Sequence, residues 1–382
     1  MSMLDTLQKW QTTLAVGTLL SRRAWASISY TPKGGTETTD ISEDLMQYLL
    51  SIDYNDNMMD QVDDITLTLE DKAQLWQNQW FPEPGSKIDL TIYTINKESL
   101  DDGVKQLHVG VFEVDQIDVN GMPSTVEIKA VSADSSGSLR GEKKNRTWEN
   151  ISVWKCASDI ASENGLQLAW YCDDNPNLDH TEQSDESDLE FLRKVVKDAG
   201  FCLKVDAKRI IIFDEQKQEE GDALIYFVRP GTYLRADALQ TEKQGPVPKQ
   251  VDTFTSYRMT SKTRDTYQAC HVRYKNGKEG DVIEATYTAP DGTQGQTLEV
   301  NEQVHDTAEA ERLAKKKLRE KNKEAVTCSF GLYGDFIYAA GALIQLKNFG
   351  KFDGKYIVTK VNHHLGSGYT CSLDMRRCLH GY

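Results

Sequence analysis

Alternation of apolar and polar residues, the pattern of half-buried strands, dominates both ends of the chain. Near the N-terminus it occurs in WASISY (25–30), ITLTLE (65–70), KIDLTIY (87–93), HVGVFEVDQIDV (108–119) and TVEIKAVSA (125–133). Towards the C-terminus it occurs in YQACHVRYK (267–275), DVIEATYTA (281–289), VTCSFGLYG (326–334), ALIQLKNFG (342–350), KYIVTKVNHH (355–364) and YTCSLDMRR (369–377). The pattern predicts two β-rich regions, each an antiparallel sheet or a small barrel.

Between these regions the apolar residues change to helical spacing. The stretch WENISVWKCASDIASENG (148–165) predicts a helix that Gly165 ends. A second helix is predicted to begin at Ser187, because Glu190 three residues later completes a capping-box pattern, and to end at Gly200, which favours a left-handed C-cap. Two short strands are expected in 201–215. The region is therefore predicted to be a small α/β module.

Polar and glycine-containing segments mark the expected boundaries. Residues 134–150 separate the first β-rich region from the module, EQKQEEGD (215–222) is predicted to be a charged loop, and KQGPVPKQ (243–250) a linker. We predict a first β domain at 1–137, an inserted α/β module at 138–222 and a second β domain at 246–382, which includes a helix at 306–322. Residues 223–245 are candidates for completing the first domain.

Charge and cysteine content limit the classes of partner. The chain has 44 Lys and Arg against 59 Asp and Glu, a net charge of −15. This argues against a surface specialised for nucleic acid or anionic membranes, since both need clustered positive charge. Seven cysteines without a C-x-x-C motif indicate reduced thiols in a cytosolic product.

No apolar run approaches the ~20 residues of a membrane helix. Residues 1–20 are expected to form a short amphipathic arm and not a signal peptide.

The densest group of ionisable side chains lies in HTEQSDESDLEFLRKVVKDAG (180–200). Five carboxylates fall within the nine residues from Glu182 to Glu190, two residues after His180. Acidic residues before and within the first turn of a helix suit the positive end of its dipole. We therefore interpret these carboxylates as part of a structural helix start, with Ser187, Glu190 and Gly200 as its caps.

Other patterns give weaker indications of chemistry. Segments 53–57 and 173–179 begin like calcium loops but lack glycine at the sixth position and glutamate at the twelfth. His363 and His364 are neighbours in a predicted strand, so their side chains are expected on opposite faces. The Trp76–Trp80 pair is expected to fill the core. No catalytic or phosphate-binding motif occurs, and we predict no catalytic residue, metal ligand or cofactor.

The segment EQSDESDLEFL (182–192) also resembles a protein family. It is similar to the Q-x-x-E-S-D-x-x-F-L signature of contractile-tail hub proteins, which include the phage late control D family and the hub part of the type VI secretion spike. Further segments also resemble this family, in the same order along the chain, at 40–85, 110–134, 139–153 and 308–382. The resemblance thus extends over nearly the whole chain.

This resemblance implies a fold, an assembly and a location. The expected fold class is α+β, mostly β, with two tail-tube-like antiparallel β-barrel domains and the small α/β module between them. The expected state is a homotrimer that adapts a sixfold tail tube protein to a threefold spike protein and lines the central channel. Tape-measure and baseplate wedge proteins are further expected partners. The resemblance implies a baseplate component of a phage, tailocin or related particle, assembled in the bacterial cytoplasm.

Two other functions stay open from the residues alone. A cell-wall-degrading tail hydrolase needs a carboxylate pair whose spacing is set only in the folded chain. A carbohydrate-binding tail-tip protein is suggested by the seven tryptophans and sixteen tyrosines. The family resemblance instead implies no enzymatic activity, no specific nucleic-acid binding and no membrane anchor. It also implies that any cell-wall-cutting activity lies on another chain.

Overall fold

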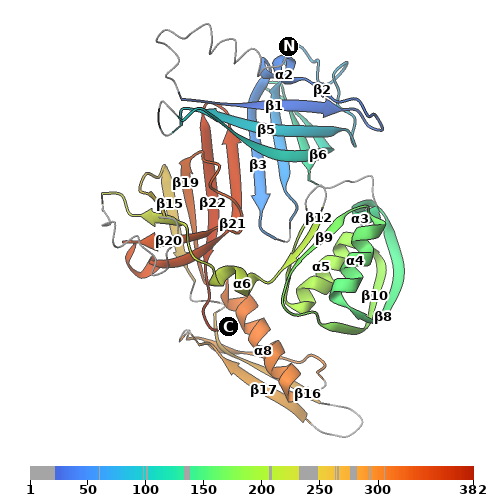
Figure 1. The fold of residues 1–382 in the computed structure, drawn as a ribbon, viewed down its shortest axis with the longest axis vertical. Coiled ribbons are helices and arrows are strands. Elements are labelled where there is room, and N and C mark those ends of the chain that lie inside the picture. The colour runs from blue at the N-terminus through green and yellow to red at the C-terminus, as the bar shows by residue number, and fades with distance from the viewer. Residues whose placement is uncertain are drawn as a thin grey trace.

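The structure is a computed structural model that describes residues 22–382 except 60, 98, 100–101, 133–137, 206–208, 232–247, 263, 265, 276–281, 291, 293 and 305. The arm expected at 1–20 lies outside the described residues. Strands predominate (Figure 1), which confirms the expectation of a mostly β chain. In the described part of the chain, no helix is both long and apolar enough to cross a membrane.

The first β region is a curled sheet with its own apolar core. Its strands run in the order β3-β4-β7-β6-β5-β1-β2. Their bounds are β1 Arg23–Thr31, β2 Thr39–Asp40, β3 Leu49–Asn57, β4 Asp64–Glu70, β5 Lys87–Ile95, β6 Val104–Asn120 and β7 Thr125–Val131, with the short helix α2 at Ser42–Met46. Alternate residues of β4 and β5 are buried, as their sequence pattern predicts. Trp76 joins this core, whereas Trp80 is 38% exposed.

The α/β module follows as a compact unit. It contains α3 (Ser138–Gly141), β8 (Lys143–Ser152), α4 (Val153–Glu163), β9 (Gln167–Tyr171), β10 (Asn177–Ser187), α5 (Asp188–Ala199), β11 (Cys202–Val205) and β12 (Arg209–Phe213). The predicted start of the helix at 148–165 was wrong. Residues 148–152 belong to β8, which pairs with β10, and α4 begins after Ser152, whose hydroxyl accepts a hydrogen bond from the Lys155 N–H.

The second β region is a sheet of order β14-β13-β20-β21-β22-β19-β15. It comprises β13 (Ile225–Val228), β14 (Lys249–Val251), β15 (Ser256–Ser261), β19 (Val326–Tyr333), β20 (Leu343–Lys347), β21 (Gly354–Leu365) and β22 (Tyr369–Arg377), with a 3-10 turn at Gly350–Phe352. Phe227 lies on β13 and Phe330 on β19, and three strands of the sheet lie between these two strands. Their ring centroids are nevertheless 4.9 Å apart, so the sheet is strongly curled.

Two predictions for the linking segments were wrong. Of residues 223–245, which were candidates for completing the first domain, 232–245 lie outside the described residues, and β13 pairs with β20 and β14, in the second β region. The expected charged loop at 215–222 is instead the helix α6 (Glu215–Glu220). Its glutamates contact arginines that lie a hundred or more residues later in the chain, and local composition does not reveal such contacts.

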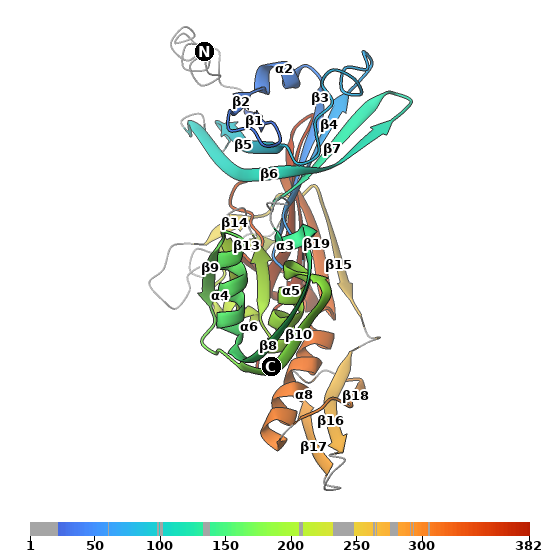
Figure 2. The ribbon, with the colours of Figure 1, turned by 90° about the vertical axis from the view of Figure 1, so that its right-hand side faces the viewer.

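A smaller unit extends from the second β region. The strands β16 (Tyr267–Lys275), β17 (Val282–Thr288) and β18 (Gln296–Val300) form a separate sheet, and α8 (Thr307–Asn322) packs on it. This unit lies at the opposite end of the molecule from the first β region (Figure 2). Asp306 caps α8 by accepting a hydrogen bond from the Glu309 N–H.

One strand joins the two β regions. β21 pairs with β20 through residues 354–357 and with β3 of the first region through residues 360–365, and Figure 1 shows it rising beside β3. We call the ladder from Lys360–Asn57 to Leu365–Ile52 the seam. Among the described strands neither β region closes into the expected barrel, because the pairings leave the sheet open at β2, β14 and β15.

Candidate functional site

The carboxylate-rich segment forms the start of α5. Ser187 is the N-cap: its hydroxyl accepts from the Glu190 N–H at 3.3 Å, and its own N–H donates to the Glu190 carboxylate at 2.9 Å. The Ser187 hydroxyl also donates to the Glu190 carboxylate at 2.9 Å, and the bond from the Ser187 N–H and this bond lower the pKa of Glu190. Gly200 ends the helix with φ of 92°, a conformation that glycine adopts without a side-chain clash. This arrangement fixes both ends of α5.

Asp188 is the buried centre of this segment. Its side chain is fully buried and accepts hydrogen bonds from Lys144 at 2.8 Å, Gln183 at 3.0 Å, Asn164 at 3.1 Å and Arg146. Burial acts to raise the pKa of Asp188, but these hydrogen bonds and the Arg146 charge outweigh it and keep the pKa below its usual value. The carboxylate therefore stays ionised.

The surroundings of Asp188 suit a structural role. A general acid or base must exchange a proton with a substrate, whereas the four side-chain donors named above all belong to the module itself. Gln183 and Asp188 both belong to the signature segment, and Lys144 and Arg146 come from β8. The carboxylate thus ties α5 to the β8–β10 ribbon.

The segments that resembled calcium loops have other partners. Asp173 lies 2.6 Å from the Lys217 ammonium, and Asn175 accepts a hydrogen bond from the Trp154 N–H. Residues 53–57 form part of β3, where Asp53 faces His364 at 2.9 Å. No group of three His, Cys, Asp or Glu residues suited to holding a metal ion occurs in the part of the chain that the structure describes.

The two neighbouring histidines point to opposite faces, as predicted. His363 is 1% exposed, and its Nδ1 lies 2.8 Å from the Tyr369 hydroxyl and 3.2 Å from Cys371 Sγ. Burial lowers the pKa of His363 to about 4, so the ring is neutral at physiological pH. Its ring stacks on Tyr54 of β3, with centroids 5.6 Å apart. His363 therefore packs within the seam.

The sequence analysis missed the ionic junctions between the parts of the molecule. Lys204 of β11 lies 2.6 Å from Asp56 and 3.2 Å from Asp63 of the first β region, and Asp56 also accepts from the Ala340 N–H at 2.7 Å. Burial raises the pKa of Asp63 to about 6, although the Lys204 charge opposes this change. One junction thus joins the α/β module and both β regions.

A second junction holds α6. Arg376 of β22 is 1% exposed and lies 2.5 Å from carboxylate oxygens of both Glu215 and Glu219. Arg319 of α8 lies 2.7 Å from Glu219. Two arginines therefore neutralise two glutamates between α6, α8 and β22. No sequence motif marks this cluster, since its members are spread over more than 150 residues.

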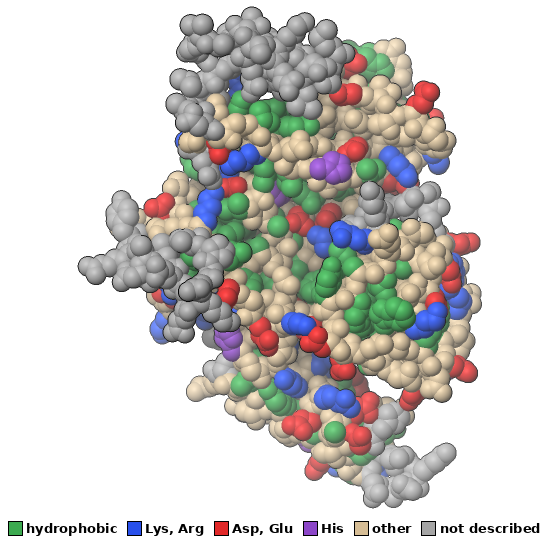
Figure 3. Space-filling model, in the orientation of Figure 1, with side chains coloured by type: hydrophobic (Ala, Val, Ile, Leu, Met, Phe, Trp, Pro, Cys, Tyr) green, Lys and Arg blue, Asp and Glu red, His purple; other side chains and the backbone are tan. Residues whose placement is uncertain are grey.

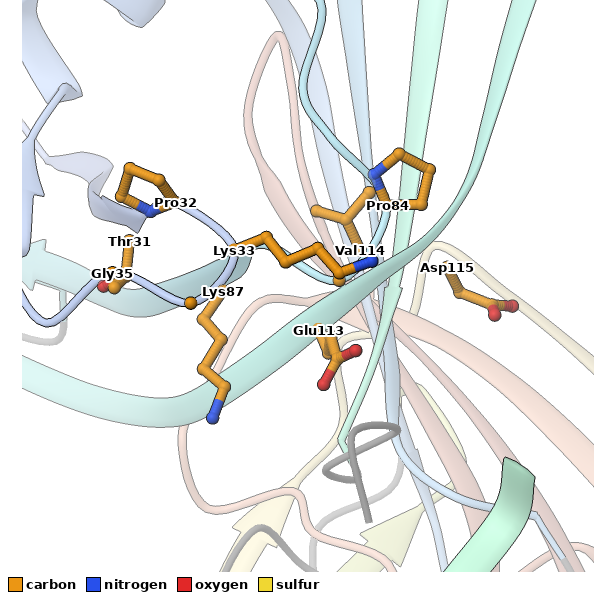
Figure 4. Close-up of a pocket in the computed structure, with 11 residues that line it drawn as sticks. Thr31, Pro32, Lys33, Gly35, Pro84, Lys87, Glu113, Val114 and Asp115 are labelled. Carbon is orange, nitrogen blue, oxygen red and sulfur yellow. The ribbon is translucent and has the colours of Figure 1, made fainter. Parts of the chain in front are cut away.

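A shallow pocket lies on the first β region (Figure 4). Lys33, Lys87, Glu113 and Asp115 line it, together with backbone of the turns at 31–35 and 84–85. Its two lysines and two carboxylates give no net charge, and it lacks a nucleophile with an adjacent base. The pocket therefore does not indicate a reaction.

Comparison with known proteins identifies relatives. The family model described as phage tail baseplate hub (GPD) matches residues 111–369. The probable baseplate hub protein of Escherichia phage 186 is 26% identical over 219 residues, covering 56% of this chain and 47% of that protein. The corresponding protein of Escherichia phage P2 is 26% identical over 180 residues, covering 46% and 43%. The chain thus spans about half the length of the curated relatives it matches.

Solved structures show the same fold. The 43 kDa tail protein of prophage MuSo2 from Shewanella oneidensis superposes with a TM-score of 0.63 at 12% identity, covering 92% of this chain and 98% of that one. A tail protein from Neisseria meningitidis MC58 gives 0.63 at 11% identity, covering 92% and 96%. Because the family model spans more than half of the chain, the protein belongs to the phage tail baseplate hub family.

Proposed function

We propose that the protein is a non-enzymatic structural hub in the baseplate of a contractile phage tail, tailocin or related injection system. In this proposal three copies form a ring that adapts a sixfold tail tube to a threefold spike and surrounds a central channel. Its partners are further copies of itself, the tail tube protein and the spike protein, with tape-measure and wedge proteins as neighbours. In this proposal the particle assembles in the bacterial cytoplasm.

The seam is the observation that carries this proposal. It joins two curled sheets into one continuous sheet, with β21 common to both. Backbone pairing, the stacked rings of His363 and Tyr54 and the hydrogen bond from Asn362 to Asn55 at 3.1 Å all cross it. Such a joint resists rotation of one β region against the other. A trimer of rigidly paired β regions presents six similar units at fixed angles, which a sixfold tube requires.

The proposal keeps the predicted domain ranges 1–137, 138–222 and 246–382. It assigns β13, which lies between the last two ranges, to the second β domain. The separate apolar cores of the first β region, the α/β module and the second β region support such a division. The β16–β18 and α8 unit has a further core of its own. Two barrel-like domains form in this proposal when neighbouring copies cover the open sheet edges, because closure removes exposed strand edges.

Light scattering of the purified chain tests the assembly. The expected mass is three times that of the 43.1 kDa chain, with interfaces that bury ~2,000 Å² or more each, as permanent oligomers do. A mass that stays at one chain over the whole concentration range contradicts the proposal. Peptidoglycan zymography tests the hydrolase alternative: we expect no clearing, and clearing that a single Asp or Glu substitution abolishes would establish an enzyme.

A further inference from the structure

A group of large apolar side chains is exposed on the first β region, where the residues that follow α2 contact the turn at 76–80. Met46, Trp80 and Phe81 are 38%, 38% and 47% exposed. The ring of Tyr48 lies against that of Trp80, with the two centroids 5.5 Å apart and the ring planes at 80°. We call these four side chains the apolar patch.

The apolar patch rests on a fixed base. Trp76 is 8% exposed, and its ring lies 6.2 Å from that of Tyr48 and 5.4 Å from that of Trp80. The Tyr48 carbonyl accepts a hydrogen bond from the Glu70 N–H at 2.7 Å, which ties the patch to the end of β4. The patch is therefore formed before anything binds to it.

Such a group is an exception on this chain. In the view of Figure 3, charged side chains of both signs are spread over much of the described surface. Single exposed apolar side chains are normal on a soluble protein, whereas groups of them usually mark a contact site. Aromatic residues and methionine are also the types that binding surfaces favour. The patch thus has the composition of a docking surface.

The residues that precede β1 have the composition to cover it. Residues 4–20 are rich in apolar side chains, and their single aspartate and single lysine cancel in charge. Leu7, Trp10 and Leu14 follow a spacing of three and four residues, so a helix places them on one face. Isolated helices of about this length are marginal in water and are stabilised by packing of their apolar face.

This segment is attached close to the patch. It leads into β1, which begins at Arg23, and Figure 2 shows α2 lying over β1 and β2. The Ile28 N–H donates to the Ser42 hydroxyl at 2.9 Å, so the contact with α2 lies about 17 Å along the strand from Arg23. Seventeen residues span about 25 Å as a helix and about 55 Å when extended. Residues 4–20 can therefore reach the patch.

We propose that the apolar patch binds residues 4–20 of its own chain as an amphipathic helix, with Leu7, Trp10 and Leu14 against the patch. The short connection to β1 favours the segment of the same chain over that of a second copy, because a short linker gives a high effective concentration. The bound segment covers an apolar surface that would otherwise promote association. This inference does not depend on the proposed trimer.

Photo-crosslinking from residue 10 tests this assignment in the full-length chain. Trp10 is replaced by the photoreactive amino acid p-benzoylphenylalanine, which keeps an aromatic side chain at this position. A denaturing gel separates cross-links within one chain, which keep its mass of 43.1 kDa, from cross-links between copies, which double it. Phe81→Glu and Met46→Glu are the patch variants. Val282→Glu, at a 41% exposed position on β17, is the matched control.

The expected product has the mass of one chain and joins residue 10 to peptides from 42–50 or 76–82. Phe81→Glu should lower its yield roughly tenfold, because a charge replaces a large apolar contact, and Val282→Glu should leave the yield unchanged. Products of twice the mass overturn the assignment to the same chain. Cross-links to other parts of the chain, no cross-links, or an equal yield in both patch variants overturn the patch as the site. The mass measured by light scattering judges the proposed trimer separately.

Discussion

Replacing Asp188 by Asn tests the structural interpretation of the signature segment. The substitution keeps the size of the side chain but removes its charge, and an amide has only one oxygen to accept from the four donors around Asp188. Lys144 and Arg146 are then left with Glu163, at 3.6 and 2.7 Å, as their remaining carboxylate. Glu163 is about half exposed, so it compensates only in part.

The expected loss of stability in Asp188→Asn follows from the burial of the carboxylate. Breaking a buried ion pair by removing one partner costs about 3–5 kcal/mol, and the partial compensation by Glu163 places the expected loss near the lower value, about 3 kcal/mol. The matched control is Ser187→Ala, which removes a cap at the same helix end and should cost about 1 kcal/mol. Because the chain has several cores, global unfolding need not be a single transition.

Hydrogen exchange of the α4 and α5 peptides measures the local loss directly. A loss of about 3 kcal/mol accelerates their exchange roughly a hundredfold, and the control by less than tenfold. The lowered pKa of Asp188 also sets a pH window. Its stabilisation is complete above the unfolded-state value of 3.8 and is lost as the pH falls through the lower folded-state pKa.

After correction for intrinsic rates, exchange in the wild type should therefore accelerate below about pH 4. Asp188→Asn should show a smaller step, because the lowered pKa of Glu190 in the same helix still contributes one. Wild-type exchange in Asp188→Asn, with faster exchange in Ser187→Ala, would refute the assignment of Asp188 as the centre that holds α5. The stability of the helix would then rest on its caps and apolar stripe alone.

Three further changes test the junctions and the packing. Asp63→Asn should leave stability at pH 7 unchanged or raised. It should also abolish the gain in wild-type stability that urea titrations detect as the pH falls from about 6 towards 4, because the raised pKa makes the folded state bind the proton first. Arg376→Ala leaves the glutamates of α6 with one arginine and should lower the free energy of unfolding by about 3–5 kcal/mol. The control Glu220→Ala, on the exposed side of α6, should change thermal stability little. Similar losses of stability in both variants would contradict the buried cluster. Gly334→Ala should reduce the yield of folded protein sharply, because the new Cβ overlaps a tyrosine ring of β22. Gly368→Ala has open space around it and should behave as wild type in the same expression and melting assay.

Features set by neighbours in the sequence could be predicted, and those set by distant partners could not. The capping contacts of Ser187 and Glu190 lie within one helical turn, so the pattern S-x-x-E is sufficient to indicate them. The alternation in β4 and β5 likewise reports burial of one face. In contrast, 53–57 begins like a calcium loop and was not predicted to be a strand, because its aspartate and asparagines are residues that turns favour.

Distant contacts explain why that segment is a strand. Asp53 and Asn55 are accommodated by His364 and Asn362, which lie about three hundred residues later. The charged segment 215–222 shows the same limit. Local composition predicts a solvated loop, yet Glu215 and Glu219 are buried because Arg376 and Arg319 reach them from β22 and α8.

The segments 53–57 and 215–222 both lie at junctions between parts of the fold, which suggests why they are charged. Lys204 joins Asp56 and Asp63 where the α/β module meets the β regions, and Arg376 meets Glu219 where α6 lies against β22. Apolar contacts would stabilise such junctions as well or better, since desolvation offsets much of the gain from a buried ion pair. Ion pairs, however, penalise every arrangement in which a charge is left without its partner. We infer that the charges fix the relative placement of the parts.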